Sequence, residues 1–248
     1  MSSLSNKAEV QSIADQLVLP NNAFINGKFT ASKSGQTFPT INPANGSVLT
    51  NIAACDSSDM DLAVEKARKT FKSGIWSKMH PSDRKAVMVK LVKLMTRHRN
   101  TLAVLESMES GKPIKDCQEI DVPETLHCLL WHAEAADKLY DQMSPSSDDA
   151  LGMIIKEPAG VVGCVLPWNF PLMIGAWKLG PAIAAGNSVI LKPAESASLA
   201  LLRISELALE AGLPPPARRR PAGHLNQSRR HGAEAAVAPA PRRRFVLL

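Results

Sequence analysis

The stretch Val161–Glu195, VVGCVLPWNFPLMIGAWKLGPAIAAGNSVILKPAE, decides the fold. Residues 161–166 are continuously apolar, which is typical of a strand covered on both faces. Pro171 is well placed to start a helix and Gly186 to end it, and residues 188–191 then predict a second strand. Ligands of a parallel sheet bind beyond the carboxyl ends of its strands, so the loops after these two strands predict a site.

A further helix at 198–211, ended by Gly212, continues the order strand, helix, strand, helix. Right-handed crossovers of this kind build an α/β fold with a doubly wound, Rossmann-like parallel sheet. No G-x-G-x-x-G motif occurs, because none of the fourteen glycines has another glycine two positions away. The pattern alone therefore gives nucleotide binding little support.

The region before this sheet predicts small strands and helices. Residues 24–52 alternate short apolar runs with turn signals, which indicates antiparallel strands joined by tight turns such as Asn26-Gly27. Ser57 and Ser58 can cap a following helix. Pro81 starts another helix, with Arg84 mostly off its apolar face.

A third helix, expected at about 123–139, leads into a different kind of segment. Its apolar positions Leu126, Leu130 and Ala133 fall together at helical spacing. Residues 140–150 are polar and rich in turn formers, and residues 151–156 form an extended apolar run. These segments separate the helical region from the sheet.

Three polar side chains stand in the two loops of the predicted sheet. An amide such as that of Asn169 can donate a hydrogen bond to an oxyanion, a contribution of about 3 kcal/mol to transition-state stabilisation. The alternative is a turn asparagine that bonds its own backbone. Lys192 and Glu195 close the second loop, where the simpler interpretation is a solvated lysine and a first-turn glutamate facing the helix dipole.

These motifs resemble the aldehyde dehydrogenase superfamily. The resemblance covers most of the chain in the family's order and ends after Pro214. It is carried by Phe24-Ile25-Asn26-Gly27, Ile41-Asn42-Pro43, Gly111-Lys112-Pro113, Glu157-Pro158-Ala159-Gly160, Pro167-Trp168-Asn169-Phe170-Pro171, Trp177-Lys178-Leu179-Gly180-Pro181-Ala182, Gly186-Asn187, Lys192-Pro193-Ala194-Glu195 and Gly212-Leu213-Pro214. The spacing and the N-terminal segment look most like the γ-glutamyl-γ-aminobutyraldehyde type.

The resemblance implies NAD(P)-dependent oxidation of an aldehyde to a carboxylic acid. It makes Asn169 the oxyanion donor, and it implies that Lys192 and Glu195 bond the adenosine ribose. A carboxylate at that place repels the extra phosphate of NADP, so the expected cofactor is NAD, as a preference and not an exclusion.

The resemblance also assigns the large side chains near these loops. Leu166 and Trp168 would line the cofactor cleft, and Phe170 and Trp177 would wall the aldehyde channel; the alternative for each is simple core packing. Lys178 matches a family lysine near the active site, or else it is a surface lysine.

The cysteines argue against turnover by this chain alone. Cys55, Cys117, Cys128 and Cys164 are far apart, so neither a disulfide framework nor a metal site is expected. Cys164 lies in an apolar strand, where burial would raise the pKa of its thiol and block access. The resemblance places the family's nucleophilic cysteine and general-base glutamate beyond the matching part. The alternative function is a non-catalytic fragment that binds nucleotide or associates with full-length subunits.

The expected organisation has four parts. Residues 1–139 are the first part of an NAD-binding domain, 140–157 a segment of the family's oligomerisation arm, and 158–214 the Rossmann-like core. Residues 215–248 are an Arg/Pro-rich disordered tail, attributed to a frameshift or retained intron, or to a genuine arm that binds nucleic acid. With half of the sheet, we expect impaired homo-oligomerisation.

The charge distribution supports that division. The tail holds eight arginines and one acid, a net charge of +7, whereas residues 1–214 hold 21 basic and 22 acidic side chains. The near-neutral body makes no case for a nucleic-acid partner. The polar N-terminus and the lack of long apolar runs predict a cytoplasmic protein without membrane contact.

Overall fold

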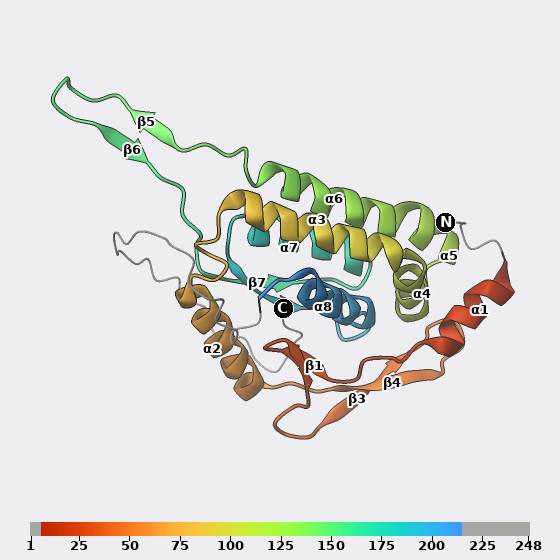
Figure 1. Ribbon diagram of the computed structural model, residues 1–248. Coiled ribbons are helices and arrows are strands. Elements are labelled where there is room, and N and C mark those ends of the chain that lie inside the picture. Colours follow the sequence, from red (N-terminus) through yellow and green to blue (C-terminus); the bar gives the residue numbers. More distant parts are fainter. Residues whose placement is uncertain (1–5, 215–248) are drawn as a thin grey trace.

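The computed structural model describes residues 6–214, so the expectations for the tail at 215–248 lie outside the described residues. Helices and small sheets alternate along the chain (Figure 1). The elements are α1 Lys7–Gln16, β1 Ala23–Ile25, β2 Lys28–Thr30, β3 Thr37–Ile41, β4 Val48–Ala53, α2 Ser57–Ser73, α3 Pro81–Arg97, α4 Arg99–Ser110, α5 Ile114–Asp116, the π-helix η1 Cys117–Asp121, α6 Val122–Ala135, β5 Gln142–Ser144, β6 Gly152–Ile154, β7 Val161–Val165, α7 Pro171–Ala184, β8 Ser188–Lys192 and α8 Leu199–Ala211.

The predicted parallel sheet is present as β7 and β8, paired from Val161↔Ser188 to Val165↔Lys192. Alternate side chains pack on opposite faces. Cys164 and Leu191 join the large core that includes α7, whereas Ile190 joins a smaller core with α2. Helices cover both faces of the sheet, and the α/β prediction is confirmed.

Coverage of β7 differs from the prediction of a strand buried on both faces. Gly163 is exposed and Val165 is 67% exposed, although Cys164 between them is buried. Helix α2 packs against the sheet where Val161 and Ile190 lie, and no described residue covers the same face at Val165. The open end of β7 is therefore its carboxyl end, where the first loop begins.

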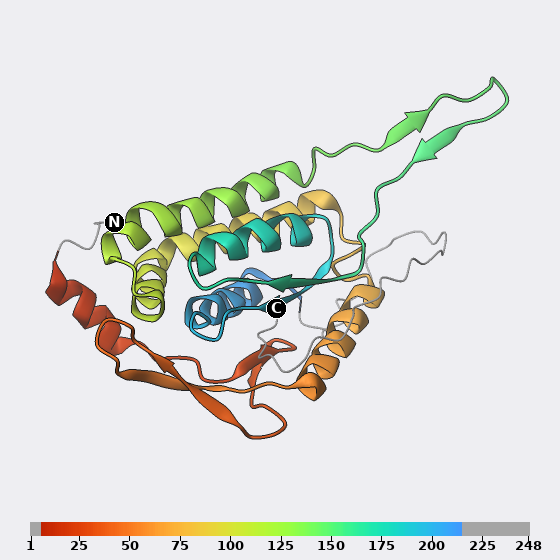
Figure 2. The same ribbon diagram turned by 180° about the vertical axis from the view of Figure 1, so that it is seen from behind.

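The helical layer packs α7 on α6, and α3 on both α6 and α8 (Figure 2). Two predictions about which side chains of these helices are buried were wrong. Arg84 is buried, because its guanidinium donates to the Ala184 carbonyl, with a distance of 3.1 Å, and to the Met79 carbonyl. Leu130 is 37% exposed, because the buried face of α6 runs through Leu129 instead.

Local turn and cap chemistry accounts for the small elements. β1 and β2 form the expected hairpin, and its turn residues Asn26 and Gly27 both have positive φ, 56° and 74°. The cap of α2 is Asp56, and not Ser57 or Ser58 as predicted. The Asp56 carboxylate accepts from the Ser58 and Asp59 amides, while the Asp59 carboxylate accepts from the Asp56 amide. This reciprocal capping box outcompetes the serines.

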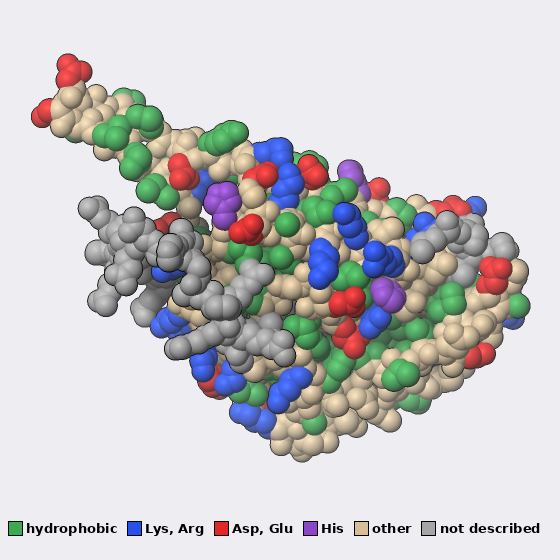
Figure 3. Space-filling view, in the orientation of Figure 1, with side chains coloured by type: hydrophobic (Ala, Val, Ile, Leu, Met, Phe, Trp, Pro, Cys, Tyr) green, Lys and Arg blue, Asp and Glu red, His purple; other side chains and the backbone are tan. Residues whose placement is uncertain are grey.

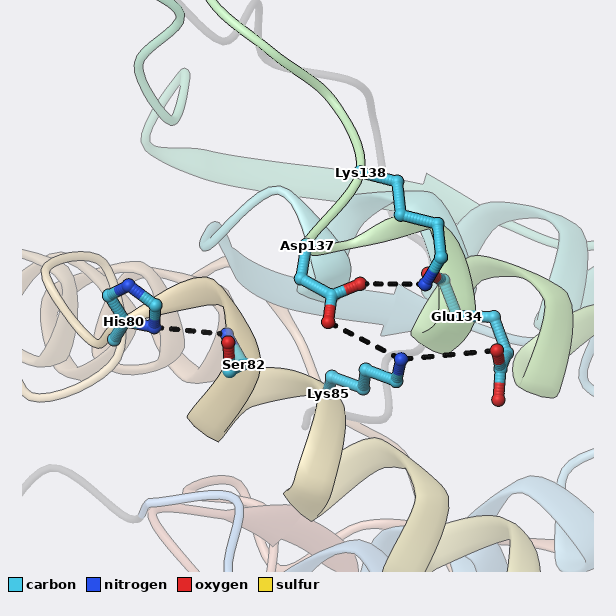
Figure 4. Close-up of polar contacts among 6 residues, drawn as sticks. All are labelled: His80, Ser82, Lys85, Glu134, Asp137 and Lys138. Carbon is cyan, nitrogen blue, oxygen red and sulfur yellow. Dashed lines mark hydrogen bonds and ion pairs between the residues drawn. The ribbon is translucent and has the colours of Figure 1, made fainter.

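A hairpin of β5 and β6 projects from the body with exposed apolar side chains (Figure 3). Before the hairpin, ion pairs join α3 to the end of α6 and to the residues that follow it (Figure 4). Lys85 Nζ lies 3.3 Å from Asp137 and 3.9 Å from Glu134, and Lys138 Nζ lies 2.9 Å from Asp137. Hydrogen bonds from Lys138 and Lys85 lower the pKa of Asp137.

Within residues 6–214 no helix is long and apolar enough to cross a membrane.

Candidate functional site

The two predicted loops start side by side. Val165 and Lys192 are register partners at the carboxyl ends of β7 and β8. The Leu166 amide donates to the Lys192 carbonyl at 2.9 Å, which extends the pairing by one residue. The first loop, residues 167–170, and the second loop, residues 193–198, therefore leave the sheet at one edge.

The second loop is held by ion pairing and by capping. Lys192 Nζ lies 3.1 Å from Glu195 Oε1. The lysine side chain is 9% exposed and the glutamate side chain 46%, so the carboxylate remains within reach of solvent. At the end of the loop, the buried Glu109 of α4 accepts hydrogen bonds from the Leu199 amide at 2.6 Å and from the Ala200 amide at 3.0 Å. Burial raises the pKa of Glu109 to about 7.

The first loop is held differently. Asn169 is exposed and Trp168 is 64% exposed. Among the described residues, no hydrogen bond holds Pro167, Trp168 or Asn169. Phe170 precedes α7 with φ −139° and ψ 64° and supplies no side-chain cap. Its half-buried ring contacts the Lys112 ammonium, 3.4 Å from the ring centroid.

A buried polar cluster lies behind this loop. Lys112 Nζ is 2.5 Å from Asp121 Oδ2, and the Asp121 side chain is 1% exposed. Glu106 is fully buried, and neither of its carboxyl oxygens makes a hydrogen bond of ordinary geometry to another described residue. Burial and the nearby Asp121 raise the pKa of Glu106 to about 8, against the effects of Lys112 and of the Leu172 amide at the start of α7.

The remaining predicted site residues lie in different environments. Leu166 is 3% exposed and belongs to the main core. Trp177 is 54% exposed and Lys178 is also exposed, so this turn of α7 faces outward. The structure thus brings Lys192 and Glu195 together and opens Asn169, Trp168 and Trp177 to solvent.

None of the four cysteines has the environment of a reactive thiol. Cys55, Cys117 and Cys164 are buried. Burial raises the pKa of Cys164, and burial together with Glu106 and Asp121 raises that of Cys117 to about 12. Cys128 is partly exposed, but burial and Glu124 raise its pKa as well. The expectation that Cys164 is inaccessible is confirmed.

A pocket of about 90 Å³ lies at the opposite end of the strands. Its walls come from the β1–β2 turn, α2, the start of β8 and the end of α8, with Trp76, Val189 and Ser205 among the lining residues. Pockets for drug-sized ligands measure roughly 300–1,000 Å³. This pocket is separate from the two loops and too small for a dinucleotide.

Sequence reasoning missed the side chains behind the loops. Glu106 and Glu109 stand three apart in the second half of α4, after the apolar run at 102–105, and that spacing places both on one face. Charged side chains inside an apolar helical stripe are a usable signal for a buried polar role. Lys112 belongs to the Gly111-Lys112-Pro113 motif, but its contact with Phe170 depends on tertiary packing.

The fold and these loops define an α/β protein of the kind that binds nucleotides at the carboxyl edge of a parallel sheet. Residues 29–219 match the model of the aldehyde dehydrogenase family. The chain belongs to the aldehyde dehydrogenase family. This match confirms the resemblance to the aldehyde dehydrogenase superfamily that the sequence motifs indicate.

Similar proteins support the same family. The aminoacetaldehyde dehydrogenase of Pseudomonas aeruginosa is 50% identical over 214 residues, which cover 86% of this chain and 43% of that protein. The indole-3-acetaldehyde dehydrogenase solved with NAD+ has a TM-score of 0.84 at 45% identity, and the match covers 86% of this chain and 43% of that one. The γ-glutamyl-γ-aminobutyraldehyde dehydrogenase of Burkholderia cenocepacia has a TM-score of 0.83 at 42% identity, covering 84% and 42%. The chain spans less than half the length of these relatives.

Proposed function

We propose that this chain supplies the cofactor-binding part and the oxyanion donor of an enzyme that oxidises an aldehyde to a carboxylic acid. The observation that carries the proposal is the Lys192–Glu195 pair at the end of β8, beside the loop that presents Asn169. Lys192 offers hydrogen-bond donors and Glu195 offers acceptors, which together suit the two hydroxyls of a ribose.

NAD fits this place as the cofactor. A solved relative carries NAD+ in its crystals, and Glu195 puts a negative charge where NADP would bring a phosphate. Once bound, NAD supplies the hydride acceptor for aldehyde oxidation. Trp168 would flank it, while Phe170 and Trp177 would face the aldehyde; the Leu166 side chain packs in the core behind this loop.

Asn169 has the exposure that its proposed role requires. Its amide makes no hydrogen bond to another described residue, so it is available to an oxygen that gains charge during the reaction. A single donor of this type contributes about 3 kcal/mol to the transition state when it is correctly placed.

The chain alone is proposed to lack turnover. A nucleophilic cysteine needs an accessible thiolate, and the pKa values of the thiols at 117, 128 and 164 are all raised. The purified chain, mixed with NAD and an aldehyde, should produce no NADH. Turnover that disappears in C128S or C164S would contradict this.

Cofactor titration tests the binding half. We expect saturable NAD binding that Lys192→Met weakens by about tenfold or more, because a charge-assisted hydrogen bond is lost. Lys115→Met is the matched control, since the Lys115 side chain is 75% exposed in a surface pair. A folded chain that binds no NAD, or equal losses in both variants, would contradict the proposal.

A second function, association with another subunit, is favoured by the β5–β6 hairpin. Met143 is 71% exposed and Met153 62%, and they are opposite each other in the register. Exposed apolar side chains on an edge invite strand pairing or burial against a partner. Met143→Lys should lower the mass measured by analytical ultracentrifugation, whereas a species that is monomeric before the change would contradict association.

A further inference from the structure

We propose that Lys112 is a positioning residue for Asn169: its ammonium, fixed by Asp121, holds the Phe170 ring and so keeps the first loop in place. The inference rests on the proposed role of Asn169 and adds the group that orders it. The Lys112 ammonium is already engaged by Asp121 and by the Phe170 ring, which suits a positioning role and not direct contact with a substrate.

The backbone of Lys112 is held by hydrogen bonds in the turn after α4. The Lys112 carbonyl accepts from the Ser107 hydroxyl at 2.7 Å, and its amide donates to Ser110 Oγ at 3.4 Å. Gly111 before it has φ 76°, and a Cβ there would lie 2.7 Å from Pro43 Cγ. These two hydrogen bonds, together with the need for glycine at position 111, fix the backbone from which the Lys112 side chain extends.

The ammonium is fixed in turn by a buried carboxylate. Asp121 closes η1 with a side chain that is 1% exposed, and its distance to Lys112 Nζ is 2.5 Å. An unpaired carboxylate at that depth would be strongly unfavourable, so the two charges stay together. Glu106 adds a second acidic group to the same cluster.

Phe170 links this cluster to Asn169. Its ring centroid is 3.4 Å from Lys112 Nζ, well within the range of a cation–π interaction. The loop has a hydrogen bond at its first end, from the Leu166 amide to Lys192, and within residues 6–214 none is made by residues 167–169. The ring of Phe170 is thus the side-chain anchor at the second end, directly next to the proposed oxyanion donor.

The test measures loop order by NMR in the whole chain, without cofactor or aldehyde. The backbone order parameters of Trp168, Asn169 and Phe170 should be near the rigid value of about 0.85 in the unchanged protein. Lys112→Met combined with Asp121→Asn removes both charges, so that no buried charge is left unpaired. This double variant should lower the order parameters below about 0.6 and abolish the ring-current shift of the residue 112 side chain.

Two variants separate positioning from general destabilisation. Lys112→Arg keeps the charge and the stacking on the ring, so the loop should stay rigid. Lys85→Met removes a similarly half-buried ion-paired lysine, 26% exposed, from the network in Figure 4, and it should leave the loop unchanged. The proposal is overturned by a folded double variant whose loop stays rigid, by a Lys112→Arg loop as mobile as that of the double variant, or by a loop that is already mobile in the unchanged chain. Because no ligand is present, a failure here is distinct from a failure to bind NAD.

Discussion

The two loops at the edge of the sheet are built in opposite ways. The second loop carries its own ion pair, Lys192–Glu195, and ends in a helix whose first amides are bound by Glu109. The first loop has no hydrogen bonds of its own at residues 167–169 among the described residues, and Lys112 contacts it from another segment. The second loop is thus held by a local ion pair as well as by the distant Glu109, whereas the position of the exposed Asn169 depends on a distant contact, that of Lys112 with Phe170.

The same contrast appears between two glutamates of α4. Glu109 binds two amides at the start of α8, after the second loop. Glu106 lies near the start of α7, after the first loop, and makes no hydrogen bond of ordinary geometry to a described residue. One carboxylate stabilises a helix start, while the other is a buried acid that stays protonated over much of the neutral range.

Removal of Glu109 should have the largest effect. Glu109→Ala leaves the Leu199 and Ala200 amides buried without an acceptor, at a cost of about 2–5 kcal/mol in the free energy of unfolding. Thermal or urea denaturation measures it. Glu119→Ala is the control, because the Glu119 side chain is 65% exposed and its loss should cost less than about 0.5 kcal/mol. Equal losses of unfolding free energy in both variants would show that the hydrogen bonds from α8 to Glu109 do not stabilise the fold.

Replacement of Glu106 should act in a pH-dependent way. The folded pKa of about 8 lies above the ordinary value of 4.5, so the folded state holds a proton that the unfolded state releases. Stability linked to Glu106 is full below about pH 4.5 and is lost as the pH rises through about 8. Glu106→Gln should match the unchanged chain at pH 5 and exceed it by on the order of a few kcal/mol above pH 8. If the free energy of unfolding depends on pH in the same way in both proteins, Glu106 is not a buried acid with a raised pKa.

Exchange of Glu195 should change cofactor choice more than stability. Glu195→Gln removes the charge that opposes the phosphate of NADP and keeps an acceptor for the ribose. The affinity for NADP relative to NAD should rise by about fivefold to tenfold, as expected for one partly exposed like-charge contact. Isothermal titration with both cofactors measures the ratio, and an unchanged ratio would remove Glu195 from the proposed ribose site.

Truncation of Asn169 should have the smallest effect on this chain. Its side chain is exposed and bonds no described residue, so Asn169→Ala should change the free energy of unfolding by less than about 0.5 kcal/mol. NAD affinity should also stay within about twofold, in contrast to Lys192→Met. A large loss of stability would mean that Asn169 acts as a structural turn residue.

Local sequence signals predicted the local part of the fold. Pro171 and Gly186 bracket α7 as expected, and Asn26-Gly27 forms the expected hairpin turn. The pairing of Lys192 with Glu195 brings two predicted ribose-site residues together. Each of these features depends on residues within a few positions of one another.

Tertiary contacts account for what could not be predicted. Arg84 is polar by type, and only the carbonyls at the end of α7 and at Met79 make its burial favourable. The exposure of Val165 depends on where α2 ends on the sheet, which no pattern within β7 encodes. Glu106 and Lys112 belong to the site through packing between helices, and one sequence does not reveal that packing.

The carbonyl end of α7 carries a consequence for how this region acquires its structure. The Trp76 indole donates to the Ile183 carbonyl at 3.0 Å, and Arg84 donates to the Ala184 carbonyl, both about a hundred residues away along the chain. We therefore expect that the strand–helix–strand unit does not fold by itself, since the end of its central helix is bound by residues far earlier in the chain. Contacts of such sequence separation slow folding, because the long loop must close before they form. A peptide spanning residues 158–214 alone would lack the Trp76 and Arg84 donors, and we expect the region to gain order only when the earlier helices are present.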